Sequence, residues 1–351
     1  AHKPRGKLCG TAGHNSEKCD DATGGFECVQ STHHPLRSRE HLRVVVLGGG
    51  RRNQRTDDCG GWGAGMTLVS AATPFDLLFD VRGTEKPGPR SLIPAVRDIY
   101  GGDWTLPEAG NRPYCYSNFV MSHDGRISFA VPGHEGGGDV SGFDAHDQWL
   151  MGLLRCRADA VLVGANTLRS EPEHVWTPEF IAPDHAPLFE QQRQADGRTQ
   201  PPLQVFVTSS GQIFRDATVF QRADVKVVIV TTEQARTSVE ALRLPRTELL
   251  LAGDTQVDLP RALEILSSQW GVETLLCEGG PRLYGSLVNS GSLDEEFLTI
   301  SPLVIGSSDE APRPGLLEGF SFQPATSPRA NLLAVRRAGD HLFLRTAWRN
   351  P

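Results

Sequence analysis

One short stretch in the last third of the chain constrains its fold more than any other. Residues 272–277 form an apolar run that predicts a buried strand, and residues 281–289 have the apolar spacing of a helix. An acidic residue, two glycines and Pro281 separate them and predict a tight turn. Because glycines admit a ligand close to the backbone and the first N–H groups of a helix attract anions, the turn predicts a pyrophosphate site. A nucleotide cofactor is therefore the strongest candidate ligand.

Strands and helices alternate from Arg112 onward, which is typical of an α/β domain. We expect strands at residues 114–121, 160–164, 203–208, 225–231, 248–251, 272–277, 296–300, 331–336 and 341–347. We expect helices at residues 143–157, 233–242, 260–270 and 281–289, and a long loop beside the site at residues 171–202. The consecutive strands after Asp294 predict an antiparallel edge, so the sheet should be mixed, mostly parallel and flanked by helices.

The first 111 residues differ from this pattern. Residues 1–65 hold 12 of the 37 glycines and little apolar periodicity, so we expect a disordered leader. The first methionine is Met66, so a mistaken gene start would also explain the leader, and its native status stays open. Residues 66–111 should form a lead-in arm with a short helix at 91–100, and residues 112–351 the folded domain.

Net charge and hydropathy limit the classes of partner that the chain can bind. The formal net charge of −7 argues against nucleic acid and anionic membranes, because both attract clustered Lys and Arg. The apolar runs are shorter than the roughly 20 residues that cross a bilayer, and no signal-peptide region is visible. These features predict a cytoplasmic enzyme.

The seven cysteines include no Cys-x-x-Cys pair. Cys115, Cys156 and Cys277 lie in apolar segments and are expected to be buried thiols. The other four lie in the first 65 residues near three histidines, which invites a zinc interpretation: Cys9, Cys19, Cys28, Cys59, His14, His33 and His34. Structural zinc sites prefer short paired spacings, so unpaired thiols and no bound metal are expected.

Four motifs occur in order: YCYSNFVMSHDGR at 114–126, ADAVLVGANTLRSEP at 158–172, CEGGPRLYGS at 277–286 and LDEEFLTISPLVIG at 293–306. Together they resemble the pyrimidine reductases of riboflavin biosynthesis, the family of the C-terminal reductase domain in the bifunctional riboflavin deaminase/reductase. The resemblance covers about 240 residues, from Arg112 to the end. The deaminase signature, His-x-Glu followed by Pro-Cys-x-x-Cys, does not occur in residues 1–111, so deaminase activity is not expected.

The resemblance implies a dihydrofolate-reductase-like fold, NADPH as cofactor and a homodimer. Its implied reaction reduces the ribosyl group of 5-amino-6-(5-phosphoribosylamino)uracil to the ribitylamino product. The implied substrate contacts are Asn118, Ser122, Asp124 and Glu278. The implied cofactor contacts are Met121, Gly164, Thr167, Gly279, Gly280, Pro281, Arg282, Leu283, Tyr284, Gly285 and Ser286.

Glu171 is our candidate catalytic residue. The family usually has two adjacent aspartates before a proline, whereas this chain has Ser170-Glu171-Pro172, one residue shorter. Glu171 keeps a carboxylate beside the cofactor motif, so our hypothesis is that it protonates the departing ring oxygen of the ribosyl group.

Two alternatives stay open. A dihydrofolate or other pteridine-like reductase would keep the fold and the cofactor but change the substrate. A non-catalytic nucleotide-binding regulator would keep only the cofactor pocket. The glycine run at 136–138, where the family has side chains that face the substrate, and the shortened segment at Glu171 motivate this second alternative.

Overall fold

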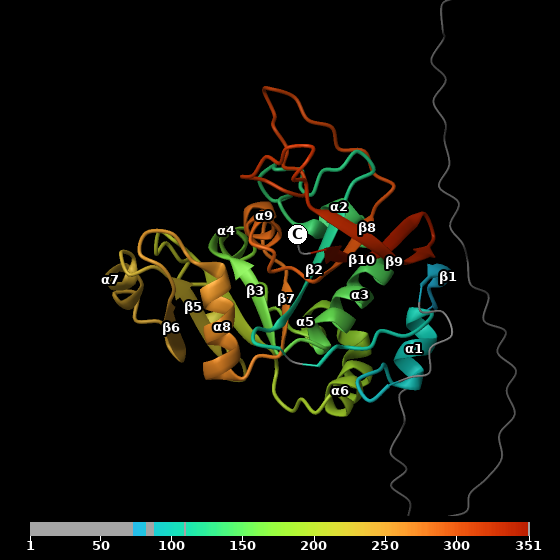
Figure 1. The fold of residues 1–351 in the computed structure, drawn as a ribbon, viewed down its shortest axis with the longest axis horizontal. Coiled ribbons are helices and arrows are strands. Elements are labelled where there is room, and N and C mark those ends of the chain that lie inside the picture. Colours follow the sequence, from blue (N-terminus) through green and yellow to red (C-terminus); the bar gives the residue numbers. More distant parts are fainter. Residues whose placement is uncertain (1–72, 82–87, 109, 350–351) are drawn as a thin grey trace, which may run out of the picture. The chain divides into compact units, whose positions relative to one another are not determined.

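A computed structural model describes residues 73–81, 88–108 and 110–349 of the chain. In this part, ten strands form one sheet in the order β1-β9-β10-β8-β2-β7-β3-β4-β5-β6 (Figure 1). The strands are β1 (Asp76–Asp80), β2 (Tyr114–Met121), β3 (Ala160–Gly164), β4 (Leu203–Val207), β5 (Val227–Thr231), β6 (Thr247–Leu251), β7 (Thr274–Cys277), β8 (Glu295–Ile300), β9 (Arg329–Ala338) and β10 (His341–Arg349).

The α-helices of the described residues connect these strands. They are α1 (Pro94–Tyr100), α2 (Gly137–Ser141), α3 (Ala145–Cys156), α4 (Ala165–Ser170), α5 (Pro178–Ile181), α6 (Ala186–Ala195), α7 (Arg236–Glu240), α8 (Leu259–Trp270) and α9 (Pro281–Asn289). Two 3₁₀ turns, Pro183–His185 and Thr218–Phe220, complete the set.

Strand direction confirms the predicted fold class. The seven strands from β8 to β6 in the sheet order run parallel to one another. Strand β10 is antiparallel to β8, and β9 and β1 continue the sheet in the antiparallel sense. The sheet is therefore mixed and mostly parallel, and its antiparallel edge is built by the late strands, as the sequence predicts.

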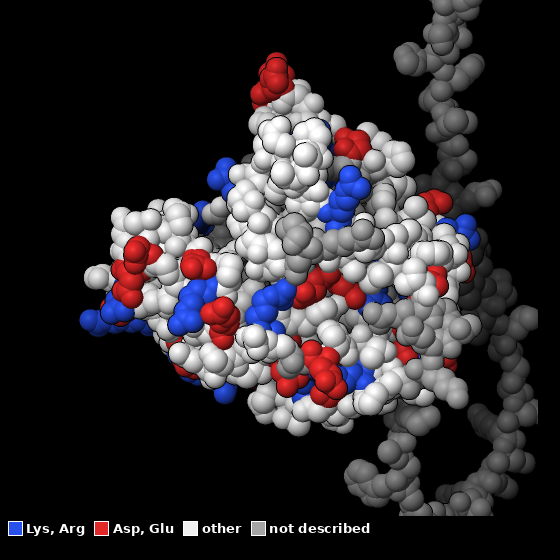
Figure 2. All heavy atoms as spheres, in the orientation of Figure 1, with Lys and Arg blue, Asp and Glu red and all other residues white. Residues whose placement is uncertain are grey.

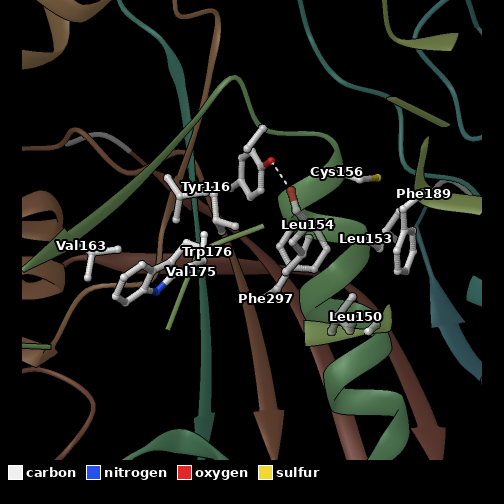
Figure 3. Close-up of a cluster of buried hydrophobic side chains, with 14 of the residues drawn as sticks. Tyr116, Leu150, Leu153, Leu154, Cys156, Val163, Val175, Trp176, Phe189 and Phe297 are labelled. Carbon is white, nitrogen blue, oxygen red and sulfur yellow. Dashed lines mark hydrogen bonds between the residues drawn. The ribbon is translucent and has the colours of Figure 1, made fainter. Parts of the chain in front are cut away.

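Alternate residues of the central strands pack on opposite faces of the sheet, because side chains alternate along a strand. In β3, Val161 and Val163 join a cluster that contains buried residues of α1, α3 and α6. Ala160 and Leu162 join a second cluster, with α8 and α9. Figure 3 shows part of the first cluster, where the Tyr116 hydroxyl donates a 2.8 Å hydrogen bond to the carbonyl of Leu154. Helices therefore cover both faces of the sheet.

Residues 171–202 are not one long loop, and that prediction was wrong. The segment contains α5, the first 3₁₀ turn and the ten-residue helix α6. Only Phe189 and Gln192 of α6 are buried, so its sequence lacks the apolar stripe that reveals a helix.

Part of the segment predicted as a lead-in arm packs into the first cluster. Val96 and Tyr100 of α1 are buried there, together with Trp104 and Leu106. The domain boundary at residue 111 stays a prediction. The predicted leader at residues 1–65 and its four cysteines lie outside the described residues.

Cys115, Cys156 and Cys277 are buried free thiols, which confirms their prediction. Among the helices that the structure describes, none is both long enough and apolar enough to span a membrane. On the face that Figure 2 shows, acidic and basic side chains are interspersed.

Candidate active site

The site lies where the parallel strands β2, β3 and β7 end. These three strands are neighbours in the sheet, so their carboxyl ends meet at one edge. The chain leaves β3 directly into α4 and leaves β7 through Glu278, Gly279 and Gly280 into α9. Ligands of open α/β sheets bind at this edge, beyond the carboxyl ends of the strands.

The turn before α9 needs its first glycine for packing. A Cβ atom on Gly279 would lie 2.5 Å from Leu283 Cδ2 and 3.3 Å from the backbone nitrogen of Gly164. Gly280 is the N-cap of α9 and brings no capping side chain to the first turn of the helix. The turn from β7 and the turn from β3 therefore lie against each other, and the start of α9 stays open to a ligand.

Two adjoining cavities occupy this edge. The first has a volume of about 690 Å³ and is lined from β2, α3, α4 and the glycine run at 136–138. The second has a volume of about 810 Å³ and is lined from the ends of β3 and β4 and the first turns of α4 and α9. Both are lined by the same dividing wall, which consists of Asn166, Thr167, Gly280, Pro281 and Pro314. A ligand that crosses this wall can occupy both.

A chain of polar side chains runs along the first cavity. Arg155 of α3 is buried, and its Nε and Nη2 atoms lie 2.9 and 2.8 Å from Glu278 Oε2. Its Nη2 atom is also 2.9 Å from His174 Nε2. His174 Nδ1 in turn lies 3.2 Å from Glu171 Oε2. On the other side, Asn118 Nδ2 donates to Glu278 Oε1 at 3.3 Å.

Burial sets the protonation states of these polar side chains. It lowers the pKa of His174 to about 2, with the Arg155 charge as a further cause, so the imidazole is neutral. Since arginine only donates hydrogen bonds, His174 Nε2 must accept, and the ring proton sits on Nδ1 beside Glu171. Burial raises the pKa of Glu171; the Glu278 charge raises it further and the Arg155 charge opposes both. Glu171 therefore stays protonated to a higher pH than an exposed glutamate does.

The two cavities differ in charge. The first is lined by one arginine, Arg155, and by five acidic residues: Glu135, Asp139, Asp147, Glu171 and Glu278. The second is lined mainly by basic side chains. Its lining includes three arginines, Arg169, Arg282 and Arg313. The single carboxylate among its described lining residues is Glu318, whose Oε1 accepts a hydrogen bond from the backbone N–H of Gly315. Polyanionic groups are therefore favoured in the second cavity over the first.

The segment between β8 and β9, residues 301–328, covers the site. In Figure 1 it lies with the loop after β2 above the ends of the central strands. Residues Pro312, Arg313, Pro314 and Glu318 of this segment line the second cavity, and Pro314 also lines the first. Its placement explains why these residues, distant from the other motifs in sequence, belong to the site.

Sequence comparison establishes the family to which the chain belongs. A family model, the RibD C-terminal domain, matches residues 113–342, well over half of the chain. The chain belongs to this family. The match confirms the resemblance found in the four motifs.

Two curated relatives carry the name 2,5-diamino-6-ribosylamino-4(3H)-pyrimidinone 5′-phosphate reductase. The protein from Methanothermobacter thermautotrophicus is 30% identical over 198 residues, 56% of this chain and 82% of the relative. The protein from Aquifex aeolicus is 25% identical over 226 residues, 64% of this chain and 89% of the relative.

Solved structures share the fold. A pyrimidine reductase-like protein from Corynebacterium diphtheriae aligns with a TM-score of 0.54 and 23% identity, over 69% of this chain and 94% of that one. RibD of Acinetobacter baumannii aligns with a TM-score of 0.52 and 18% identity, over 68% of this chain and 59% of that one.

In this RibD C-terminal domain, most of the predicted site residues meet at the two cavities. The first cavity is lined by Asn118, Glu171, Glu278 and Gly279. The second is lined by Gly164, Arg282, Leu283 and Ser286, and Thr167, Gly280 and Pro281 belong to the dividing wall.

Five predicted residues line neither cavity. Ser122 and Asp124 instead hold the covering segment in place. Ser122 Oγ donates to Asp124 Oδ1 at 2.6 Å, and Asp124 accepts from the backbone N–H groups of Ile305 and Gly306 at 3.0 and 2.7 Å. These hydrogen bonds, the Ile305 bond first among them, hold the pKa of Asp124 well below its usual range. Their observed contacts are thus with the protein itself.

The other three are Met121, Tyr284 and Gly285. The Met121 carbonyl accepts from the N–H of Ser301, and the buried Tyr284 hydroxyl donates to Glu296. A Cβ on Gly285 would lie 2.8 Å from the Glu318 carbonyl, so this glycine lets α9 approach the covering segment.

Sequence reasoning missed five titratable residues of the first cavity. They are Glu135, Asp139, Asp147, Arg155 and His174. Asp147 of α3 is 3% exposed, and burial raises its pKa to about 6. The available signal was the position of Asp147 and Arg155 among the buried residues of α3, since a charged residue on an apolar stripe needs a partner or a task.

Proposed function

We propose that this chain is an NADPH-dependent reductase that converts the ribosyl group of 5-amino-6-(5-phosphoribosylamino)uracil into the ribitylamino group, a step of riboflavin biosynthesis. One observation carries the proposal: two adjoining cavities of opposite charge meet at the ends of β2, β3 and β7. The names of the two curated relatives, both pyrimidinone phosphate reductases, support the type of reaction.

The second cavity fits the phosphates of a dinucleotide. The first turn of α9 begins at Gly280 without a capping side chain, so its N–H groups and the helix dipole favour an anion. Gly164 has no atom within 4 Å of the position a Cβ would take, which leaves room beside the backbone. Arg169, Arg282 and Arg313 supply the positive charge that favours a cofactor with an additional 2′-phosphate.

When bound, the reduced nicotinamide would supply a hydride to C1′ of the ribosylamine. The protein has to help the sugar ring open first, because the C1′–O4′ bond must break to leave an iminium carbon. Glu171 is the proposed donor of the proton that O4′ takes, and burial favours its protonated form. The Arg155–Glu278 pair and neutral His174 hold Glu171 and Asn118 in place around the cavity.

The test is to follow NADPH absorbance at 340 nm with each candidate substrate. Oxidation only with the phosphoribosylaminouracil supports the proposal. Oxidation with dihydrofolate alone would replace it with a pteridine reductase. NADPH binding without oxidation of any candidate would support a regulator. We also propose that the protein is cytoplasmic and forms a homodimer. Sedimentation equilibrium would measure its state of assembly.

A further inference from the structure

A tight turn brings Glu171 and His174 together at the wall of the first cavity. Pro172 and Glu173 are its central residues, and the backbone N–H of His174 donates to the carbonyl of Glu171 at 3.1 Å. Proline favours the second position of such a turn because its φ angle is already fixed. The two side chains both line the cavity, and His174 Nδ1 lies 3.2 Å from Glu171 Oε2, within hydrogen-bond distance.

Neighbouring side chains fix the orientation of the His174 imidazole. The ring packs against the rings of Trp176 and Phe180, whose centroids are 4.8 and 4.6 Å away. Its Nε2 atom lies 2.9 Å from Arg155 Nη2, which can only donate. The neutral ring therefore carries its proton on Nδ1, and the protein presents an N–H group to one particular oxygen of Glu171.

The other carboxyl oxygen of Glu171 faces the glycine run at 136–138. A Cβ atom on Gly136 would lie 3.2 Å from Glu171 Oε1, so the missing side chain leaves room for this oxygen. Among the residues that the structure describes, Oε1 has no hydrogen-bond partner. The Glu171 side chain is 31% exposed, so a ligand in the cavity can reach it. The two oxygens of one carboxyl group thus have different surroundings.

We propose that His174 is a positioning residue for Glu171: its Nδ1–H donates to Oε2 and leaves Oε1 as the oxygen that carries and delivers the acid proton. This proposal rests on the proposed function, because it concerns the acid of the same ring opening. When the Oε1–H bond breaks, the proton passes to O4′ and the electron pair of the C1′–O4′ bond stays with O4′. The carboxylate that forms keeps its hydrogen bond from Nδ1, which tightens in the substrate complex.

Two amide variants separate this role from a merely structural one. His174→Gln places an amide oxygen near the position of Nε2, so it keeps an acceptor for Arg155 but loses the donor to Glu171. His174→Asn places an amide N–H near the position of Nδ1, so it keeps the donor and loses the acceptor. We expect kcat to fall about fivefold in His174→Gln, the effect of one lost hydrogen bond, with KM nearly unchanged. His174→Asn should recover most of this loss.

The matched control is His185→Gln in the first 3₁₀ turn, which lines neither cavity and should leave kcat unchanged. A purely structural His174 would act through the hydrogen bond from Arg155, and His174→Asn would then be the more damaged variant. A kcat that is equal in the two His174 variants, or lower in His174→Asn, overturns the proposal.

Nitrogen NMR of the wild-type protein, labelled with ¹⁵N-histidine, tests the geometry without a substrate. The signal that disappears in His174→Gln identifies His174. Because burial lowers the pKa of His174 to about 2, we expect a neutral ring with its proton on Nδ1 at neutral pH. A proton on Nε2, or a charged ring at neutral pH, overturns the proposal.

Carbon NMR of the Glu171 carboxyl group separates this proposal from the proposed function. Burial raises the pKa of Glu171, and the charged groups that face it are Arg155, which lowers the pKa, and Glu278, which raises it. An N–H group donated to a carboxylate lowers its pKa, so the pKa of Glu171 should rise in His174→Gln and stay nearer the wild-type value in His174→Asn. If no candidate substrate is reduced, the proposed function fails, while this titration still decides the role of His174. An unchanged Glu171 pKa in His174→Gln overturns that role.

Discussion

Replacing Arg155 with methionine tests whether the buried pair with Glu278 holds the first cavity together. The two side chains are 1% and 6% exposed, so the substitution leaves a buried carboxylate whose remaining hydrogen bond from the described residues is the 3.3 Å contact from Asn118. Breaking a buried pair in this way typically costs 3–5 kcal/mol, and we expect the free energy of unfolding to fall by about 4 kcal/mol. Urea unfolding followed by the fluorescence of the buried tryptophans would measure the loss.

Two further variants make that measurement decisive. Arg261→Met removes an exposed pair on α8, whose side chains are 60% and 56% exposed, and should cost about 0.5 kcal/mol or less. The double variant Arg155→Met, Glu278→Met replaces both charges by apolar groups and should recover most of the loss. A loss below about 1 kcal/mol in Arg155→Met, or a double variant less stable than the single one, would refute the reasoning.

Three other predictions concern the chemistry and the cofactor. Glu171→Gln, which cannot supply a proton, should lower kcat by more than about tenfold and leave NADPH affinity nearly unchanged. Steady-state kinetics would measure kcat and a fluorescence titration would measure NADPH affinity; a normal kcat would remove Glu171 from the mechanism. Because the pKa of Asp147 is raised to about 6, the protonated form stabilises the fold, and this contribution is lost as the pH rises from about 4 to 6. Relative to Asp147→Asn, wild-type stability should therefore fall by up to about 3 kcal/mol over that window in urea titrations, and parallel pH profiles would contradict this. Gly164→Ala has an allowed backbone (φ −78°) and open space, so it should weaken NADPH binding about tenfold with an unchanged melting temperature; Gly279→Ala, with Leu283 Cδ2 at 2.5 Å, should lower the melting temperature.

The parts of the fold that sequence predicts best are those buried on both faces. Strands β2 and β3 begin and end at the predicted residues. Strand β3 is a continuous apolar run, which is typical of a central parallel strand, and β2 is apolar and aromatic except at Ser117 and Asn118. Helix α6 escaped prediction because tertiary contacts, rather than its own pattern, hold it in place. Its Gln192 Oε1 accepts from the backbone N–H of Ile93, a residue 99 positions away.

The candidate site likewise has one part that the local sequence reveals and another part that it does not. The turn at Gly279 and Gly280 is local, so its glycines and proline reveal it. The polar chain of the first cavity is not local: Arg155 contacts Glu278 across 123 positions of sequence. Asp124 shows the opposite case, a predicted substrate contact whose observed partners belong to the protein. Its carboxylate accepts from backbone N–H groups 181 and 182 positions away, and its motif alone cannot distinguish this role from a substrate contact.

The position of β2 in the sheet has a consequence for how the nascent chain acquires its structure. Both neighbours of β2, namely β7 and β8, come from the last third of the chain, whereas β3, β4, β5 and β6 pair in the order in which the ribosome makes them. This buried strand of the middle of the sheet must therefore wait without a hydrogen-bonded neighbour until β7 at Thr274–Cys277 has been made. Such exposure favours aggregation and slow closure of the centre, so β2 is the segment of this domain that a chaperone would most usefully shield.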